Sequence, residues 1–159
     1  MKKLLLTLTA AALATGSALA DHHGKKLDPA KADVKVTING NDQMQFDKTE
    51  IEAKAGQIVA ITFKNIGNLP VEAMGHNLVV LKPDTNVVNF AMDGIQNKAG
   101  GFLPNKADLK AAIVANTKIL GPKQEETIVF KVAEPGEYPY LCTFPGHFGV
   151  MKGVLKVAK

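Results

Sequence analysis

The residues of this chain with the richest chemistry lie in one short segment near the C-terminus, which holds the only cysteine. Cys142 is followed by His147 five positions later and by Met151 four positions after that. A thiolate, an imidazole and a thioether suit a soft or borderline metal ion, and a trigonal His2Cys set with a weak axial Met is typical of copper electron-transfer sites. The set lacks one imidazole, and His76 is the only other histidine beyond residue 23. The sequence therefore predicts one copper ion held by two distant segments.

The N-terminus predicts export from the cytoplasm. Residues 1–20 combine Lys2 and Lys3, an apolar run over 4–14 and a small-x-small cleavage site at 18–20, which is typical of a secretory signal peptide. The run is shorter than the ~20 apolar residues that a membrane helix needs. We expect cleavage after Ala20 and no membrane span in the mature protein.

The mature chain is long enough for one domain, which we place at residues 33–159, after a flexible polar tail over 21–32. Cleavage would put His23 third from a free amino terminus, where amine, amides and imidazole can chelate Cu(II), although a plain polar tail is the commoner case. Removing the signal lowers the formal charge from +4 to +2, and the chain has no arginine for bidentate phosphate recognition. We expect no nucleic-acid partner, and we expect a monomer.

The elements that position the candidate ligands read mainly as strands. Period-two alternation and β-branched residues recur along the chain, separated by Asn, Gly and Pro turns. Between residues 84 and 116 the pattern changes, and we expect a short helix near 86–95 and an irregular flap over 97–115 with a helical turn at 106–111. This organisation predicts a β-sandwich with one helical insertion. The expected strands are 33–38, 51–53, 58–64, 77–81, 127–132, 137–142 and 151–157.

The strand pattern places the candidate ligands at one end of the sandwich. Cys142 would end one strand and Met151 would begin the next, with His147 on the connecting loop. Pro145 and Gly146 would stiffen and turn that loop. We expect His76 to come from a strand end elsewhere and to tie the two sheets together through the ion.

Several segments together resemble the azurins, within the cupredoxin family, from about Val34 to the C-terminus. The resemblance implies an all-β, cupredoxin-like Greek-key β-sandwich with a short helical flap. It also implies a periplasmic protein in which one type 1 copper, cycling between Cu(I) and Cu(II), carries single electrons. The segments that carry it are 74–77 (MGHN), 142–147 (CTFPGH), 151–153 (MKG), 39–46 (NGNDQMQF), 67–70 (GNLP) and 117–121 (TKILG).

The resemblance also implies roles for individual residues. His76, Cys142 and His147 would be equatorial copper ligands, Met151 the axial ligand, and the Gly75 carbonyl a weak contact on the opposite side. Asn77 and Phe144 would support the thiolate and the ligand loops from outside the ligand set. An apolar patch for docking redox proteins, such as c-type cytochromes or a periplasmic reductase, would surround the edge of His147. Its members would be Met44, Leu69, Met74, Phe144, Pro145 and Val150.

The chain departs from the azurin pattern away from the ligands. The cysteines of the usual N-terminal disulfide are missing, which removes a cross-link generally worth ~2 to 4 kcal/mol. Leu78 stands where azurins often have a tryptophan, and Asn65 and Asn116 replace two histidines. Phe148 enlarges the apolar rim.

Two other functions compete with electron transfer. The first is a copper-binding or delivery protein in which the histidine tail passes the metal onward; such a protein would be colourless and would exchange Cu(I) rapidly. A hydrolase with Cys142 as nucleophile and His147 as base would leave Met151 without a role, and the sequence shows no orienting acid. Alone, each residue of the set has an ordinary structural explanation, whereas together, on an exported all-β chain, they favour an electron carrier that is not an enzyme.

Overall fold

The computed structural model describes residues 27–159, so the predicted signal peptide and the His22-His23 pair lie outside the described residues. The described chain begins with a 3-10 turn, η1 (Pro29–Lys31), which the Asp28 side chain caps by accepting a hydrogen bond from Ala30 N at 2.9 Å. Ala32 is buried against the domain. Residues 28–32, which we predicted as the end of a flexible tail, are therefore folded, because a capped turn and a buried methyl group fix them.

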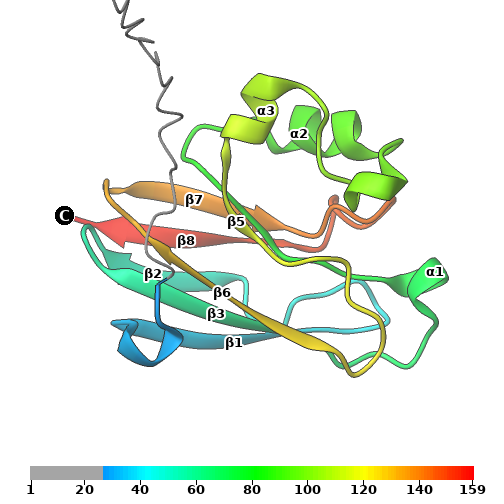
Figure 1. Ribbon diagram of the computed structural model, residues 1–159, viewed down its shortest axis with the longest axis horizontal. Coiled ribbons are helices and arrows are strands. Elements are labelled where there is room, and N and C mark those ends of the chain that lie inside the picture. Colours follow the sequence, from blue (N-terminus) through cyan, green and yellow to red (C-terminus); the bar gives the residue numbers. More distant parts are fainter. Residues whose placement is uncertain (1–26) are drawn as a thin grey trace, which may run out of the picture.

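The chain forms two sheets packed face to face, as predicted, and most strands that follow one another in sequence lie in different sheets (Figure 1). In each sheet one pair is parallel, β1 with β3 and β2 with β8, and the remaining pairs are antiparallel. The three-stranded sheet has the order β1 (Val34–Gly40), β3 (Ile58–Asn65) and β6 (Glu125–Lys131). The five-stranded sheet has the order β2 (Glu50–Lys54), β8 (Lys152–Ala158), β7 (Gly136–Leu141), β4 (Val79–Leu81) and β5 (Ile113–Asn116).

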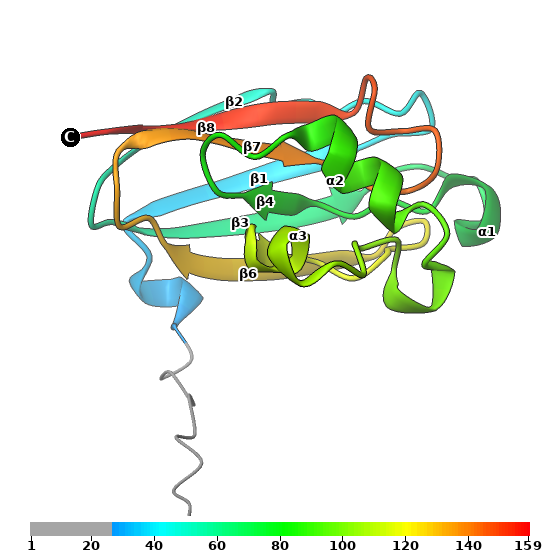
Figure 2. The same cartoon turned by 90° about the horizontal axis from the view of Figure 1, so that it is seen from above.

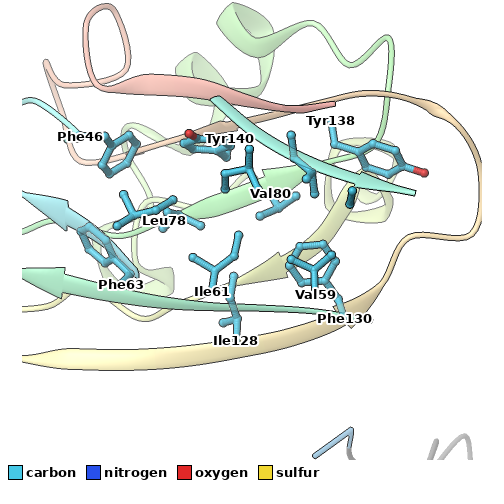
Figure 3. Packing of buried hydrophobic residues seen from close by; sticks show 14 of the residues in the cluster. Phe46, Val59, Ile61, Phe63, Leu78, Val80, Ile128, Phe130, Tyr138 and Tyr140 are labelled. Atoms are coloured by element: carbon cyan, nitrogen blue, oxygen red, sulfur yellow. The ribbon is translucent and has the colours of Figure 1, made fainter. Parts of the chain in front are cut away.

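The main hydrophobic core fills the space between the sheets (Figure 3). Alternate residues of β3, namely Val59, Ile61 and Phe63, are fully buried and face side chains of the other sheet. Tyr140 of β7 is fully buried too, and its hydroxyl donates to the Lys48 carbonyl at 2.8 Å. Each such side chain stabilises the fold by about 1.5–3 kcal/mol. The period-two pattern of the sequence therefore correctly placed Val59, Ile61 and Phe63 on one face of the strand, and the structure shows that this face points inward.

The helical flap covers the outer face of the five-stranded sheet (Figure 2). It contains α2 (Val87–Gly94), the 3-10 turn η2 (Lys98–Gly100) and α3 (Ala107–Ala111). Asn86 caps α2 by accepting from Asn89 N at 2.9 Å. Phe90 of α2 packs in a second core cluster with Val79, Leu81, Ala91 and Leu141. Both predicted helical segments are confirmed.

Two elements of the structure were not predicted. The helix α1 (Val71–Met74) begins directly after Pro70, where the sequence indicated only a loop, and it is too short to show a periodic pattern. The strand β5 lies within the segment predicted as an irregular flap. All four of its residues are half-buried, so it shows no alternation of apolar and polar residues. Among the described residues, none of the helices is long and apolar enough to span a membrane.

Candidate metal centre

The β7–β8 hairpin brings two of the predicted ligands side by side. Cys142 directly follows β7 and donates its backbone N–H to the Met151 carbonyl at 3.0 Å, which extends the ladder by one residue pair. Between them the chain makes a compact turn in which the His147 carbonyl accepts from Val150 N at 3.1 Å and from Met151 N at 2.8 Å. Gly146 has a φ of 86°, which a residue with a side chain adopts only with strain. The Cys-x4-His-x3-Met spacing is thus the length of one tight loop.

The remaining predicted ligand, His76, lies just before β4, the strand that neighbours β7 in the same sheet. His76 follows α1 and forms a bridge with Leu120: His76 N donates to the Leu120 carbonyl at 3.1 Å, and the His76 carbonyl accepts from Leu120 N at 2.7 Å. β4, which starts just beyond, pairs with β7 through Val79 and Leu141. The expectation that His76 ties the two sheets together is therefore wrong. Because β4 and β7 are antiparallel neighbours, the residues before one and after the other already meet at the same sheet end.

Three donor atoms converge at this point. His76 Nδ1 lies 3.1 Å from His147 Nδ1, and Cys142 Sγ lies 3.9 Å from the first and 3.6 Å from the second. A triangle with these sides has its centre about 2.1 Å from each corner, close to the metal–nitrogen and metal–sulfur bond lengths of about 2.0 to 2.3 Å found in proteins. All three side chains are buried. The residues therefore fit a single metal ion without rearrangement.

Burial sets the protonation state of the metal-free site. It raises the pKa of the Cys142 thiol to about 12, and the backbone amides of Asn77 and Phe144 offset part of that rise. Burial, followed by the proximity of His76, lowers the pKa of His147 to about 4. Burial also lowers the pKa of His76, against the opposing effects of the Asn41 carbonyl and Asp42. Both imidazoles are thus neutral at neutral pH and ready to bind a cation, while the thiol must release a proton to do so.

The metal-free protein should lose stability in mild acid. The pKa of His147 is lower in the folded chain than in the unfolded one, so the unfolded chain takes up a proton first as the pH falls. The contribution of His147 to the free energy of unfolding is complete above about pH 6.5 and is lost as the pH falls to about 4. The loss amounts to up to about 3 kcal/mol. Urea unfolding of the metal-free protein across this pH range measures it. A pH-independent free energy of unfolding, or an equal slope in a His147→Gln variant, would contradict the prediction.

Asn77 joins the two ligand segments through its side chain. Its Oδ1 accepts from Thr143 N at 2.8 Å, and its Nδ2 donates to Thr143 Oγ1 at 2.8 Å. The backbone amides of Asn77 and Phe144 also act on the Cys142 sulfur. The residues that directly follow His76 and Cys142 are thus locked to one another, which fixes the separation of the two ligands.

Glycine positions leave room for the other predicted contacts. A methyl group on Gly75 would lie 2.6 Å from the Val71 carbonyl oxygen and 2.7 Å from Ile119 Cγ2, so no side chain fits there. Met151 is fully buried, and its Cε would lie 2.7 Å from a methyl group on Gly40 of β1. The structure therefore places Met151 next to Cys142 in the ladder, with its methyl group against Gly40.

The helix α1 and the β7–β8 loop, which hold several residues of the predicted apolar patch, lie at the same end of the sandwich (Figures 1 and 2). Leu69 and Val150 are 44% and 63% exposed, which is unusual for large apolar side chains. The other patch residues are half-buried, and so is Phe148. These residues are Met44, Met74, Phe144 and Pro145.

Sequence analysis did not single out Phe102 and Asn97 of the flap. Phe102 is buried, has a φ of 60° and packs edge-on against Phe144, with ring centroids 5.2 Å apart. Asn97 holds the surrounding turn through its side chain, which donates to the Leu103 carbonyl at 2.9 Å and accepts from Gly100 N at 3.1 Å. The one signal in the sequence was an aromatic residue directly after Gly100-Gly101.

Comparison with known proteins extends over nearly all of the described chain. Residues 32–158 match the model of copper-binding proteins of the plastocyanin/azurin family. The chain is 38% identical to Azurin-1 of Alcaligenes xylosoxydans xylosoxydans over 130 residues, which cover 79% of this chain and 98% of that protein. It is 35% identical to the azurin of Pseudomonas fluorescens biotype C over 128 residues, which cover 78% and 98%.

Solved structures give the same result. The reduced auracyanin of Roseiflexus castenholzii superposes with a TM-score of 0.69 at 34% identity and covers 80% of this chain and 99% of its own. An azurin isoform from Methylomonas sp. strain J has a TM-score of 0.69 at 27% identity and covers 80% and 100%. The two-sheet sandwich is therefore shared with both proteins.

Proposed function

The chain belongs to the plastocyanin/azurin family of copper-binding proteins, and from this we propose that it carries single electrons between redox proteins in the periplasm. The observation that carries the proposal is the convergence of His76 Nδ1, His147 Nδ1 and Cys142 Sγ on one point about a metal–ligand bond length from each. Met151, adjacent to Cys142, would supply the axial thioether, and the Gly75 carbonyl would be a weak contact opposite to it. A bound copper ion supplies the one-electron Cu(II)/Cu(I) couple.

The protein contributes rigidity to this function. Electron transfer is slowed by any rearrangement that accompanies the change of oxidation state, so ligands that hold one arrangement in both states favour it. Thr143 is locked to Asn77 by two hydrogen bonds of 2.8 Å, and the His147 carbonyl fixes the β7–β8 loop. The buried donors also exclude water from the site. Both features support a carrier whose ligand geometry changes little when it is reduced.

The surface at this end supports a weak, apolar encounter with partners. His147 is the ligand nearest to the surface, with 3% of its side chain exposed against none for His76 and Cys142. Around it, we propose, Met44, Leu69, Met74, Phe144, Pro145 and Val150 form the docking patch for redox proteins such as c-type cytochromes or a reductase. Small interfaces of this kind are usual for transient redox pairs.

Burial disfavours the two competing functions. A delivery protein must release its metal readily, whereas here all three donors lie beneath the surface. A thiol enzyme needs an accessible thiolate, whereas Cys142 is fully buried and the pKa of its thiol is raised to about 12. We therefore propose that the chain performs no chemistry on a substrate.

Adding one equivalent of Cu(II) to the metal-free protein tests the function. We expect an intense visible absorption band from charge transfer between the thiolate and Cu(II), which a mild reductant removes and an oxidant restores over repeated cycles. Electron spin resonance should follow the same cycle. A colourless copper complex that gives up Cu(I) rapidly to a chelator would contradict electron transfer and favour delivery. Metal-free protein is the proper starting point, because zinc accepts the same ligands.

A further inference from the structure

Phe102 is a large aromatic residue buried outside the two core clusters of residues 27–159. Only 8% of it is exposed, yet it lies in the flap, after η2, rather than between the sheets. Its ring meets the Phe144 ring at an interplanar angle of 69° with centroids 5.2 Å apart, an edge-to-face arrangement. The burial of Phe102 thus serves a contact with the ligand loop.

The backbone at Phe102 is held in a conformation that the side chain disfavours. Its φ is 60°, in the left-handed region where bulky residues are genuine outliers. Gly101 precedes it with a φ of 67°, and Phe102 N donates to the Asn97 carbonyl at 2.9 Å. A methyl group on Gly94 of α2 would collide with the Phe102 carbonyl oxygen. The flap therefore imposes this conformation, and residues held so tend to cluster at functional sites.

The contact continues from Phe144 to a predicted ligand. The Phe144 ring lies 4.8 Å from the His147 ring, with an interplanar angle of 36°. Phe144 is only half-buried, so its own position in the loop does not enclose it. Phe102 supplies the missing wall on the flap side, and its ring edge restricts the orientations in which Phe144 can cover His147.

We propose that Phe102 is a positioning residue for the redox site, which holds Phe144 against His147 and keeps water away from the ligands. This inference rests on the proposed function. For a divalent ion with one thiolate, the net charge of the site falls from +1 to 0 when it gains one electron from a partner. A dry, apolar wall favours the less charged state, so the Phe102–Phe144 pair raises the reduction potential.

The test compares Phe102→Leu with Phe90→Leu in the full chain. Both variants remove a buried phenyl ring from the flap region, but Phe90 packs in the second core cluster, and among the described ring pairs it has none with Phe144 or His147. In Phe102→Leu we expect the redox equilibrium with a reference couple to shift at least about three-fold toward the oxidised form, about 28 mV for one electron. Phe90→Leu should lower thermal stability without this shift. Phe102→Tyr, which keeps the ring, should retain the wild-type potential.

A second measurement needs no copper. In the metal-free protein, the nuclear magnetic resonance shifts of the His147 ring protons report the ring current of Phe144. They should change in Phe102→Leu and stay constant in Phe90→Leu and Phe102→Tyr. Unchanged His147 shifts in Phe102→Leu, or equal changes in Phe90→Leu, would overturn the inference. A protein that fails to bind copper would instead refute the proposed function, while this measurement would still decide whether Phe102 positions Phe144.

Discussion

Replacing Cys142 by serine should abolish the intense visible band of the copper-loaded protein. The serine hydroxyl stays protonated near neutral pH and offers no thiolate from which charge can transfer to Cu(II). The site would retain the two imidazoles, whose Nδ1 atoms lie 3.1 Å apart, but it would lose the donor that completes the triangle. Copper affinity should fall by more than the roughly 10- to 100-fold that the loss of an outer hydrogen-bonding partner costs. Absorption and electron spin resonance after titration with Cu(II) measure both effects.

The neighbouring residue provides a matched control for this prediction. Thr143 accepts a hydrogen bond from Asn77 through its hydroxyl, and Thr143→Ser keeps that hydroxyl while it removes a methyl group one position from the ligand. The Thr143→Ser protein should stay blue, and its affinity should remain close to that of the wild type. A blue Cys142→Ser protein would refute the assignment of the thiolate.

Replacing Met151 by leucine should leave copper bound and raise the reduction potential. The thioether is a weak donor that favours Cu(II), and leucine has a similar volume but no donor. Met151 is fully buried, with its methyl group near Gly40 and Phe63, so water has no open route to take its place. We expect a rise on the order of 60 mV or more, which is about a ten-fold change in a one-electron equilibrium. Redox titration against a mediator of known potential measures it.

Met44→Leu is the control for this second prediction. Met44 belongs to the apolar patch and is half-buried. Met44→Leu therefore makes the same chemical change as Met151→Leu, but at a residue outside the ligand set. The reduction potential of the Met44→Leu protein should remain close to the wild-type value, although its association with a partner protein can slow. An unchanged or lower potential in Met151→Leu would count against Met151 as an axial ligand.

Local patterns in the sequence were sufficient to predict the candidate donors and most of the strands. Cys142, His147 and Met151 lie within ten residues, so the β7–β8 hairpin brings them together whatever the rest of the chain does. Likewise, the period-two spacing of Val59, Ile61 and Phe63 indicated that they share one face of β3, which the structure shows to be buried. These features depend on side-chain type and on spacing along one segment, both of which the sequence displays.

Other features depend on contacts between distant segments, and the sequence did not reveal them. The strand β5 exists because Val79 and Val80 of β4 pair with Asn116 and Ala115, although its own residues show no strand pattern. The error about His76 has the same origin. Nothing near residue 76 says which strand lies beside β4, and the pairing with β7 sets that neighbour.

The sequence by itself predicted the candidate metal ligands and the β-sandwich that carries them, because those predictions follow from residue type and local period. Only the tertiary structure decided that the donors meet at the end of a single sheet. It also decided that a flap residue, Phe102, contacts Phe144 of the ligand loop. The physical reason is that both contacts join segments more than forty residues apart in sequence, and the packing of the whole chain fixes such contacts.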